Sequence, residues 1–214
     1  DHRPDLKQMV AGVVLDGEGY PLCCELWPGN TADVKSLKMV AIRLKNRFGI
    51  ERICVVADRG MISRNTIKEL EDNSIHYILG VRMRRNADLA PQLLDDDGYE
   101  EIVGQRKARK DPSPLKVKEV VINGQRYVLC VNPEEVRADA ETREQILSSL
   151  REHFKQGDTA LVGNKGYRRY LSVTGESHFV IDDKKVALDA RYDGKWVLTT
   201  DTDLTAVEVA LKYK

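Results

Sequence analysis

The sequence has 214 residues, of which 42% are hydrophobic and 32% are charged, and its formal net charge is zero. This length allows one sizeable hydrophobic core, and no stretch approaches the roughly 18 apolar residues that a membrane-spanning helix needs. The neutral net charge counts mildly against a nucleic-acid binder. Arginine and lysine nevertheless cluster at 82–85, 106–110 and 165–169; a solvated surface is the default interpretation of such clusters, and phosphate binding is the alternative.

The four cysteines lie in apolar, strand-like segments, and none of them form a C-x-x-C pair. Metal sites need clustered ligands, so we interpret these residues as buried, reduced thiols. Reduced thiols favour a cytoplasmic protein. The residues are Cys23, Cys24, Cys54 and Cys130.

The first third of the chain predicts alternating strands and helices. Two β-rich runs, 8–15 and 21–27, flank the turn at 16–19 and predict a hairpin. Apolar residues at helical spacing follow Thr31, a helix-capping residue, and predict a helix that ends at Gly49. The short apolar run that follows, up to Ala57, is typical of a strand covered on both faces.

A second helix, capped by Ser63 and carrying Ile67 and Leu70, precedes a predicted strand over 76–81. The order is therefore hairpin, helix, strand, helix, strand. This alternation indicates an α/β core with a central sheet.

After Arg82 the pattern changes to loop-like segments and hairpins. The Asn123-Gly124 turn inside 116–131 is a strong hairpin signal, and Asp193-Gly194 predicts a second hairpin over 186–200. Between them a helix is predicted over 138–154. Its apolar residues, expected to face inward, are Ile146, Leu147, Leu150 and Phe154.

The last segment carries a capping-box pattern, Thr205-Ala206-Val207-Glu208, which predicts a helix from about Ala206. We expect this helix to continue beyond Lys214, because a helix this short is marginal on its own.

Asp58 is the best single candidate for chemistry. It follows the predicted strand directly, and ligands in open α/β sheets sit at the carboxyl ends of the strands. A carboxylate in that place can bind a hard cation such as Mg²⁺. Position alone leaves an ordinary turn residue before Gly60 as an equal reading.

Five blocks of sequence stand in a fixed order along the chain. They are DHRPDLKQ (1–8), PGNT (28–31), VADRGM (56–61), GNKGYRRY (163–170) and TDTDL (200–204). In this order they resemble the DDE transposases of bacterial insertion sequences, and the resemblance covers essentially the whole chain.

The resemblance implies a ribonuclease H-like fold, which is an α/β mixed sheet with flanking helices, interrupted by a mostly β insertion. We therefore expect the core, without its first strand, at 1–85. The β-rich insertion, with one helix, is expected at 86–195, and the return to the core, with a truncated helix, at 196–214.

In that family three carboxylates hold two Mg²⁺ (or Mn²⁺) ions about 4 Å apart for phosphoryl transfer. Asp58 matches the second carboxylate, and is thereby the expected catalytic and metal-binding residue. The resemblance puts the first before Asp1 and the third after Lys214, so this fragment is expected to be inactive alone. We interpret Asp16 as a turn residue and Glu208 as a capping residue.

The resemblance also implies transposon-end and target DNA as partners, a homodimer in the transposition complex, and no membrane. The expected DNA-binding residues are Arg59, Lys165, Arg168 and Arg169, although an ordinary surface arginine in a turn explains Arg59 at least as well. The block at 165–170 mixes cations with aromatic rings, which suits a nucleic-acid backbone, although an exposed rim of the insertion fits equally well. Two alternatives to a transposase stay open: a ribonuclease H-like nuclease, and a non-catalytic remnant of a decayed mobile element.

Overall fold

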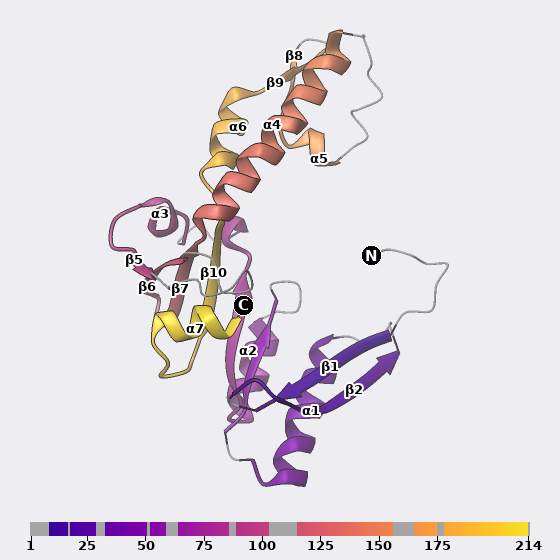
Figure 1. Ribbon diagram of the computed structural model, residues 1–214, viewed down its shortest axis with the longest axis vertical. Coiled ribbons are helices and arrows are strands. Elements are labelled where there is room, and N and C mark those ends of the chain that lie inside the picture. The colour runs from indigo at the N-terminus through magenta and orange to yellow at the C-terminus, as the bar shows by residue number, and fades with distance from the viewer. Residues whose placement is uncertain are drawn as a thin grey trace. The chain divides into compact units, whose positions relative to one another are not determined.

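The computed structural model shows a mixed α/β protein (Figure 1). It describes residues 9–16, 18–28, 33–50, 52–58, 64–85, 89–102, 115–155, 165–174 and 178–213. The chain divides into two compact units, and each is treated separately below. The first unit comprises Asp1–Val81, Thr199–Asp203 and Lys212–Lys214, and the second comprises Arg82–Leu198 and Leu204–Leu211.

The first unit begins with the predicted hairpin. Strand β1 (Met9–Leu15) pairs antiparallel with β2 (Pro21–Pro28). The Oδ1 atom of Asp16 accepts hydrogen bonds from the backbone N–H groups of Glu18, at 2.9 Å, and Tyr20, at 2.8 Å. Asp16 is therefore a turn residue, as predicted, since its carboxylate stabilises the reversal of the chain.

The rest of the first unit follows the predicted order of helix, strand, helix and strand. These elements are α1 (Asp33–Phe48), β3 (Cys54–Ala57), α2 (Arg64–Asp72) and β4 (His76–Val81). Strands β3 and β4 are parallel. Their shared face packs against both helices, in a core of Ala41, Val55, Ala57, Leu70, Ile75, Tyr77 and Leu79, with Ile53 and Ile67 at its margin.

Strand β3 is buried on one face only, so the prediction of a strand covered on both faces is wrong. Val55 and Ala57 belong to the core, whereas Cys54 is exposed and Val56 is 44% exposed. The helices α1 and α2 pack on the face that carries Val55 and Ala57, which explains the difference. All four cysteines are free, but Cys24 is also exposed, so buried thiols were predicted too broadly.

The second unit carries antiparallel strands. Its first elements are η1 (Met83–Arg85), α3 (Leu89–Leu94), β5 (Glu100–Ile102), β6 (Leu115–Ile122) and β7 (Gln125–Val131). The predicted hairpin β6–β7 is confirmed, and its turn has positive φ angles at Asn123 (52°) and Gly124 (77°). Two positive φ angles match the twist of the paired strands, which is why Asn-Gly is such a strong signal.

The main sheet has the strand order β3-β4-β10-β7-β6-β5, where β10 is Lys195–Thr200. It is mixed, because β3 and β4 are parallel while β5, β6 and β7 are antiparallel. The sheet is flanked by helices, and this confirms the predicted α/β fold class. Helix α7 (Ala206–Tyr213) follows β10 and begins where the capping box predicted.

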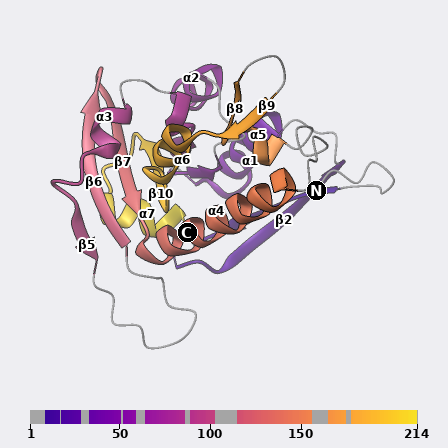
Figure 2. The ribbon, with the colours of Figure 1, turned by 90° about the horizontal axis from the view of Figure 1, so that it is seen from above.

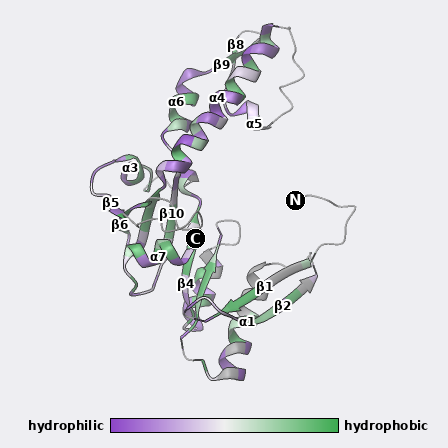
Figure 3. Ribbon diagram, viewed as in Figure 1, coloured by the Kyte–Doolittle hydropathy of each residue, from purple (hydrophilic) through white to green (hydrophobic). Residues whose placement is uncertain are grey.

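A hydrophobic core in this unit joins elements that lie close together in Figures 1 and 2. The elements are α4 (Pro133–Lys155), α5 (Lys165–Arg168), β8 (Leu171–Thr174), β9 (His178–Ile181) and α6 (Asp183–Ala190). Leu147 and Leu150 of α4 are buried here, with Ile146 and Phe154 packed beside them, as predicted. Hydrophilic and hydrophobic residues alternate along α4 in Figure 3.

The hairpin predicted over 186–200 is wrong, because its first half is helix α6. Asp182 caps this helix, and its carboxylate accepts hydrogen bonds from the N–H groups of Lys184 and Lys185. Asp193-Gly194 forms a turn between α6 and β10 instead of a turn between two strands. The described part of 86–195 thus holds α3, α4, α5 and α6, so the prediction of one helix there is also wrong.

Gly194 lies against the start of α4. Its backbone O accepts a hydrogen bond from the N–H of Asn132 at 2.9 Å, and its N–H donates to Asp139 at 2.9 Å. Its φ is +58°, and a Cβ atom at this position would lie 2.6 Å from backbone atoms of Asn132 and Val136. Next to it, the largely buried carboxylate of Asp193 pairs with Arg143 of α4. The turn and the helix can approach this closely only because residue 194 has no side chain.

We expect Gly194→Ala to lower the free energy of unfolding by about 1–3 kcal/mol more than Gly124→Ala does. Both glycines have positive φ, so both substitutions strain the backbone, but only at Gly194 does the new methyl group meet backbone atoms. Denaturant unfolding of the two variants measures the difference. Equal losses would show that the contact of this turn with α4 is not tight.

Candidate active site and basic surface

Asp58 directly follows β3 and is exposed at the carboxyl end of the parallel pair β3–β4. The hydroxyl group of Tyr213, near the end of α7, donates a hydrogen bond to its Oδ1 atom at 3.0 Å. Both residues belong to the first unit. The structure thus brings Tyr213, which sequence reasoning missed, to the carboxylate that the sequence singled out.

Asp201 lies at the other end of these strands. Its carboxylate accepts a hydrogen bond from the N–H of Tyr77 at 2.8 Å, and its Oδ2 atom is 3.1 Å from Nδ1 of His76. His76 and Tyr77 begin β4, whereas Asp58 follows the end of β3. Because β3 and β4 are parallel, Asp201 lies at the amino ends of these strands and Asp58 lies at their carboxyl ends. It fixes the start of β4 and does not join Asp58 in a site.

Glu208 is a capping residue, as predicted. Its Oε2 atom accepts a hydrogen bond from the N–H of Thr205 at 2.8 Å, and Thr205 Oγ1 accepts one from the N–H of Glu208 at 3.3 Å. This reciprocal pair satisfies two backbone donors at the start of α7. The carboxylate of Glu208 is therefore occupied at the helix terminus.

The chemistry of Asp58 fits Mg²⁺ or Mn²⁺, which prefer carboxylate oxygen. The number of nearby ligands does not fit a metal site, because among the described residues no three His, Cys, Asp or Glu side chains lie close enough together to hold a metal ion. The described part of the chain thus offers one suitable ligand and not a complete metal site.

The predicted DNA-binding residues are described unevenly. Arg59, like the predicted helix caps Thr31 and Ser63, lies outside the described residues. Lys165 opens α5, but only its backbone is described. Arg168 ends α5 and is exposed, and Arg169 follows it with 47% of its side chain exposed.

The two aromatic rings of this block contact the core to different degrees. Tyr170 is fully buried, and its hydroxyl group donates a hydrogen bond to Asp189 at 2.7 Å. Burial, together with this hydrogen bond, raises the pKa of Tyr170 to about 12. Tyr167 packs against the same core. A fully buried ring cannot stack on a base, so Tyr170 is a core residue and not a stacking platform.

Asp189 on α6 is the centre of a cluster of charges. It accepts hydrogen bonds from Tyr170 and from Nη1 of Arg84, and Nη1 of Arg169 lies 3.9 Å from its Oδ2 atom. Burial alone would raise the pKa of Asp189, but these hydrogen bonds and the nearby positive charges hold it below its ordinary value of 3.8. The carboxylate is therefore ionised and fully engaged at neutral pH.

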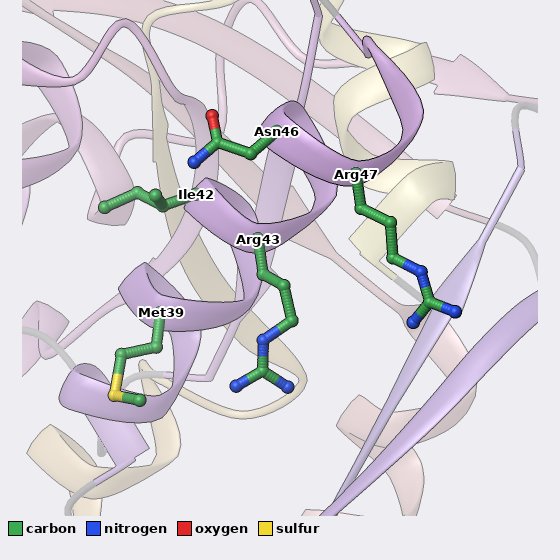
Figure 4. Close-up of a pocket in the computed structure, with 5 residues that line it drawn as sticks. All are labelled: Met39, Ile42, Arg43, Asn46 and Arg47. Atoms are coloured by element: carbon green, nitrogen blue, oxygen red, sulfur yellow. The ribbon is translucent and has the colours of Figure 1, made fainter.

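A shallow pocket lies along α1 in the first unit, and Figure 4 shows its lining. The lining side chains are Met39, Ile42, Arg43, Asn46 and Arg47. They include no carboxylate, histidine or thiol, and Arg43 forms an ion pair with Glu25 of β2 at 2.8 Å. The described residues that line this pocket therefore offer no group for metal binding or acid–base catalysis.

The protein family described as Transposase DDE domain matches the chain over residues 5–214. The chain therefore belongs to this family of enzymes that cleave and join nucleic acid, and the resemblance seen in the sequence is confirmed. Its mixed sheet with flanking helices is compatible with the ribonuclease H-like fold expected for it. A search of the curated proteins found no match. In the described part of the chain, every helix is too short or too polar to cross a membrane.

We expect Asp189→Asn to lower the free energy of unfolding by about 1.5–3 kcal/mol at neutral pH, because the amide cannot form the charged pair with Arg84. The pKa of Asp189 is lowered by folding, so its contribution is present above pH 4 or so and is lost as the pH falls through its folded pKa. The difference in unfolding free energy between wild type and variant should therefore shrink as the pH falls below 3.8.

Denaturant unfolding across this pH range measures the gap. Asp183→Asn, which changes an exposed carboxylate on the same helix, serves as the control and should cost little. A gap for Asp189→Asn that stays constant with pH would contradict the assignment of an ionised, engaged carboxylate.

Proposed function

We propose that Asp58 is one of the carboxylates of the transposase active site, in an enzyme that cuts transposon-end DNA and joins it to target DNA. The observation that carries this proposal is the place of Asp58, exposed at the carboxyl end of a parallel strand pair. That edge of an α/β sheet is where ligands bind. The hydrogen bond from Tyr213 to Oδ1 fixes the direction in which the carboxylate points.

The metal requirement is part of the same proposal. Asp58 would contribute carboxylate oxygen to bound Mg²⁺ or Mn²⁺. Two such ions, when held by a complete set of carboxylates, supply activation of the attacking hydroxyl group and stabilisation of the leaving oxygen. The role of Asp58 is to hold its charge at the strand end, where its Oδ1 atom accepts the hydrogen bond from Tyr213.

Three further expectations belong to this proposal. The catalytic core comprises 1–85 and 196–214, and the insertion comprises 86–195. The active complex contains a homodimer bound to its DNA. We expect that residues 1–214 alone do not cleave DNA, because Asp58 is the one residue that this proposal assigns to the set of three catalytic carboxylates. Nicking by this segment that disappears on Asp58→Ala would contradict the last expectation.

We expect Asp58→Asn and Asp58→Ala to abolish metal-dependent cleavage by the full-length enzyme while leaving DNA binding largely intact. The amide keeps the shape of the side chain but loses the charge that holds a cation. Nicking of supercoiled DNA with Mg²⁺ or Mn²⁺, together with a binding assay, separates the two effects. Asp203→Asn, at an exposed carboxylate of the same unit, is the control and should cleave normally. Retained cleavage by Asp58→Ala would refute the assignment.

We expect Arg168→Gln to weaken DNA binding regardless of sequence and to lower the salt slope of the binding constant by about 1. Arg168 is exposed on α5, so the loss of one phosphate contact should not disturb the fold. Titrations at several salt concentrations measure the slope. Arg137→Gln, on the exposed side of α4, is the control. An unchanged slope for Arg168→Gln would leave the residue as ordinary surface.

A further inference from the structure

Two arginines that are distant in sequence meet at one carboxylate in the second unit. Arg84 lies on η1, Arg169 follows α5, and Asp189 lies on α6. Asp189 is 11% exposed and accepts hydrogen bonds from Arg84 and Tyr170, while Arg169 lies 3.9 Å away. The fold therefore places two guanidinium groups beside a single, nearly buried acid.

The charges of this cluster do not cancel. One carboxylate faces two guanidinium groups, and the neighbouring Arg143 is already paired with Asp193. Among the described residues of this cluster, one positive charge is thus in excess. Arg84 and Arg169 are 51% and 47% exposed, so this excess charge is presented to solvent.

Both guanidinium groups are also held by aromatic rings. The guanidinium carbon of Arg84 lies 4.9 Å from the centre of the Tyr192 ring, and that of Arg169 lies 4.6 Å from the centre of the Tyr170 ring. A stacked guanidinium uses its face against the ring, and its N–H groups remain in the plane of the fork. Less side-chain freedom is then lost when those groups bind an anion.

A purely structural role explains this arrangement poorly. Arg84 alone is enough to neutralise Asp189, and the second pair, with half-exposed Arg169 at 3.9 Å, adds little to stability. Planar, partly oriented guanidinium forks with excess charge are instead the arrangement that recognises phosphate. The sequence placed Arg84 and Arg169 in separate basic clusters, and gave no sign that they meet.

We propose that Arg84 and Arg169 form a clamp for a phosphate group of the DNA backbone, and that Asp189 positions both arginines. This inference rests on the proposed function, because it takes DNA as the ligand. The clamp is a second DNA contact in this unit, in addition to the one proposed for Arg168, and it includes Arg84 from η1.

The test is the salt dependence of binding to a random-sequence DNA duplex. Arg169→Gln is the first variant, because it leaves Asp189 bonded to Arg84 and Tyr170 and should fold normally. We expect it to weaken binding about tenfold and to lower the salt slope by about 1. Arg84→Gln should lower the slope equally, and thermal unfolding shows whether it has also lost stability.

Arg151→Gln is the matched control. Arg151 is 53% exposed and paired with Glu144 at 2.7 Å on α4, so its exposure and pairing resemble those of Arg84, but it has no carboxylate shared with a second arginine. Its salt slope should equal that of the wild type. Arg169→Lys should keep the slope but bind more weakly than wild type, since a lysine keeps the charge and lacks the fork.

Each result decides between the readings. Unchanged slopes for folded Arg169→Gln and Arg84→Gln would overturn the clamp and leave the cluster as structural. Wild-type affinity in Arg169→Lys would overturn the recognition by a fork. Failure of the wild type to bind duplex DNA at all would instead refute the proposed function, and the clamp with it.

Discussion

The parallel pairing of β3 with β4 is the constraint on which the candidate site depends. Strand β3 has four residues, and it is held by its ladder with β4 and by the burial of Val55 and Ala57 against α1 and α2. Apolar burial contributes about 25 cal/mol per Å² of surface removed from water. On so short a strand, the burial of these two side chains is a large part of what holds the strand in place. The position of Asp58 follows from this pairing, because the residue is the first after the strand.

Elements whose signals are local could be predicted from the sequence. The Asn123-Gly124 turn and the Thr205–Glu208 capping box are each determined by a few adjacent residues, and both occur as predicted. Helix α6 was missed although Asp182 is a good capping residue, because the nearby Asp193-Gly194 pair suggested a hairpin turn. That turn is set by its contact with α4, and a short window of sequence does not contain that contact.

The exposure of β3 could not be predicted for a similar reason. An apolar run shows that a strand is suited to burial, but the number of covered faces depends on which other elements pack there. Cys54, Val55, Val56 and Ala57 all belong to one apolar run. Only Val55 and Ala57 are buried. Tyr170 shows the reverse case, since a ring in a basic block that suited nucleic acid proved to be a core residue.

The candidate site was predictable as far as Asp58 alone. Its position at the end of a strand is a local feature, and the resemblance to a family selected it among the acidic residues. Tyr213 and Arg84 have no local signal, because their partners are Asp58 and Asp189, which are far away in the sequence. Such pairs become visible only when the chain is folded.

The hydrogen bond between Tyr213 and Asp58 spans 155 positions of the chain. Residues 33–81 are contiguous and contain both helices and both strands that place Asp58, so a growing polypeptide can assemble them early in synthesis. The long separation raises the free-energy cost of closing the loop only slowly, by about 0.6 kcal/mol for each doubling of loop length. Its larger consequence is a delay during synthesis. On the ribosome, Asp58 can stand at the end of β3 well before α7 is made, and its carboxylate acquires its tyrosine partner only when translation has passed residue 213.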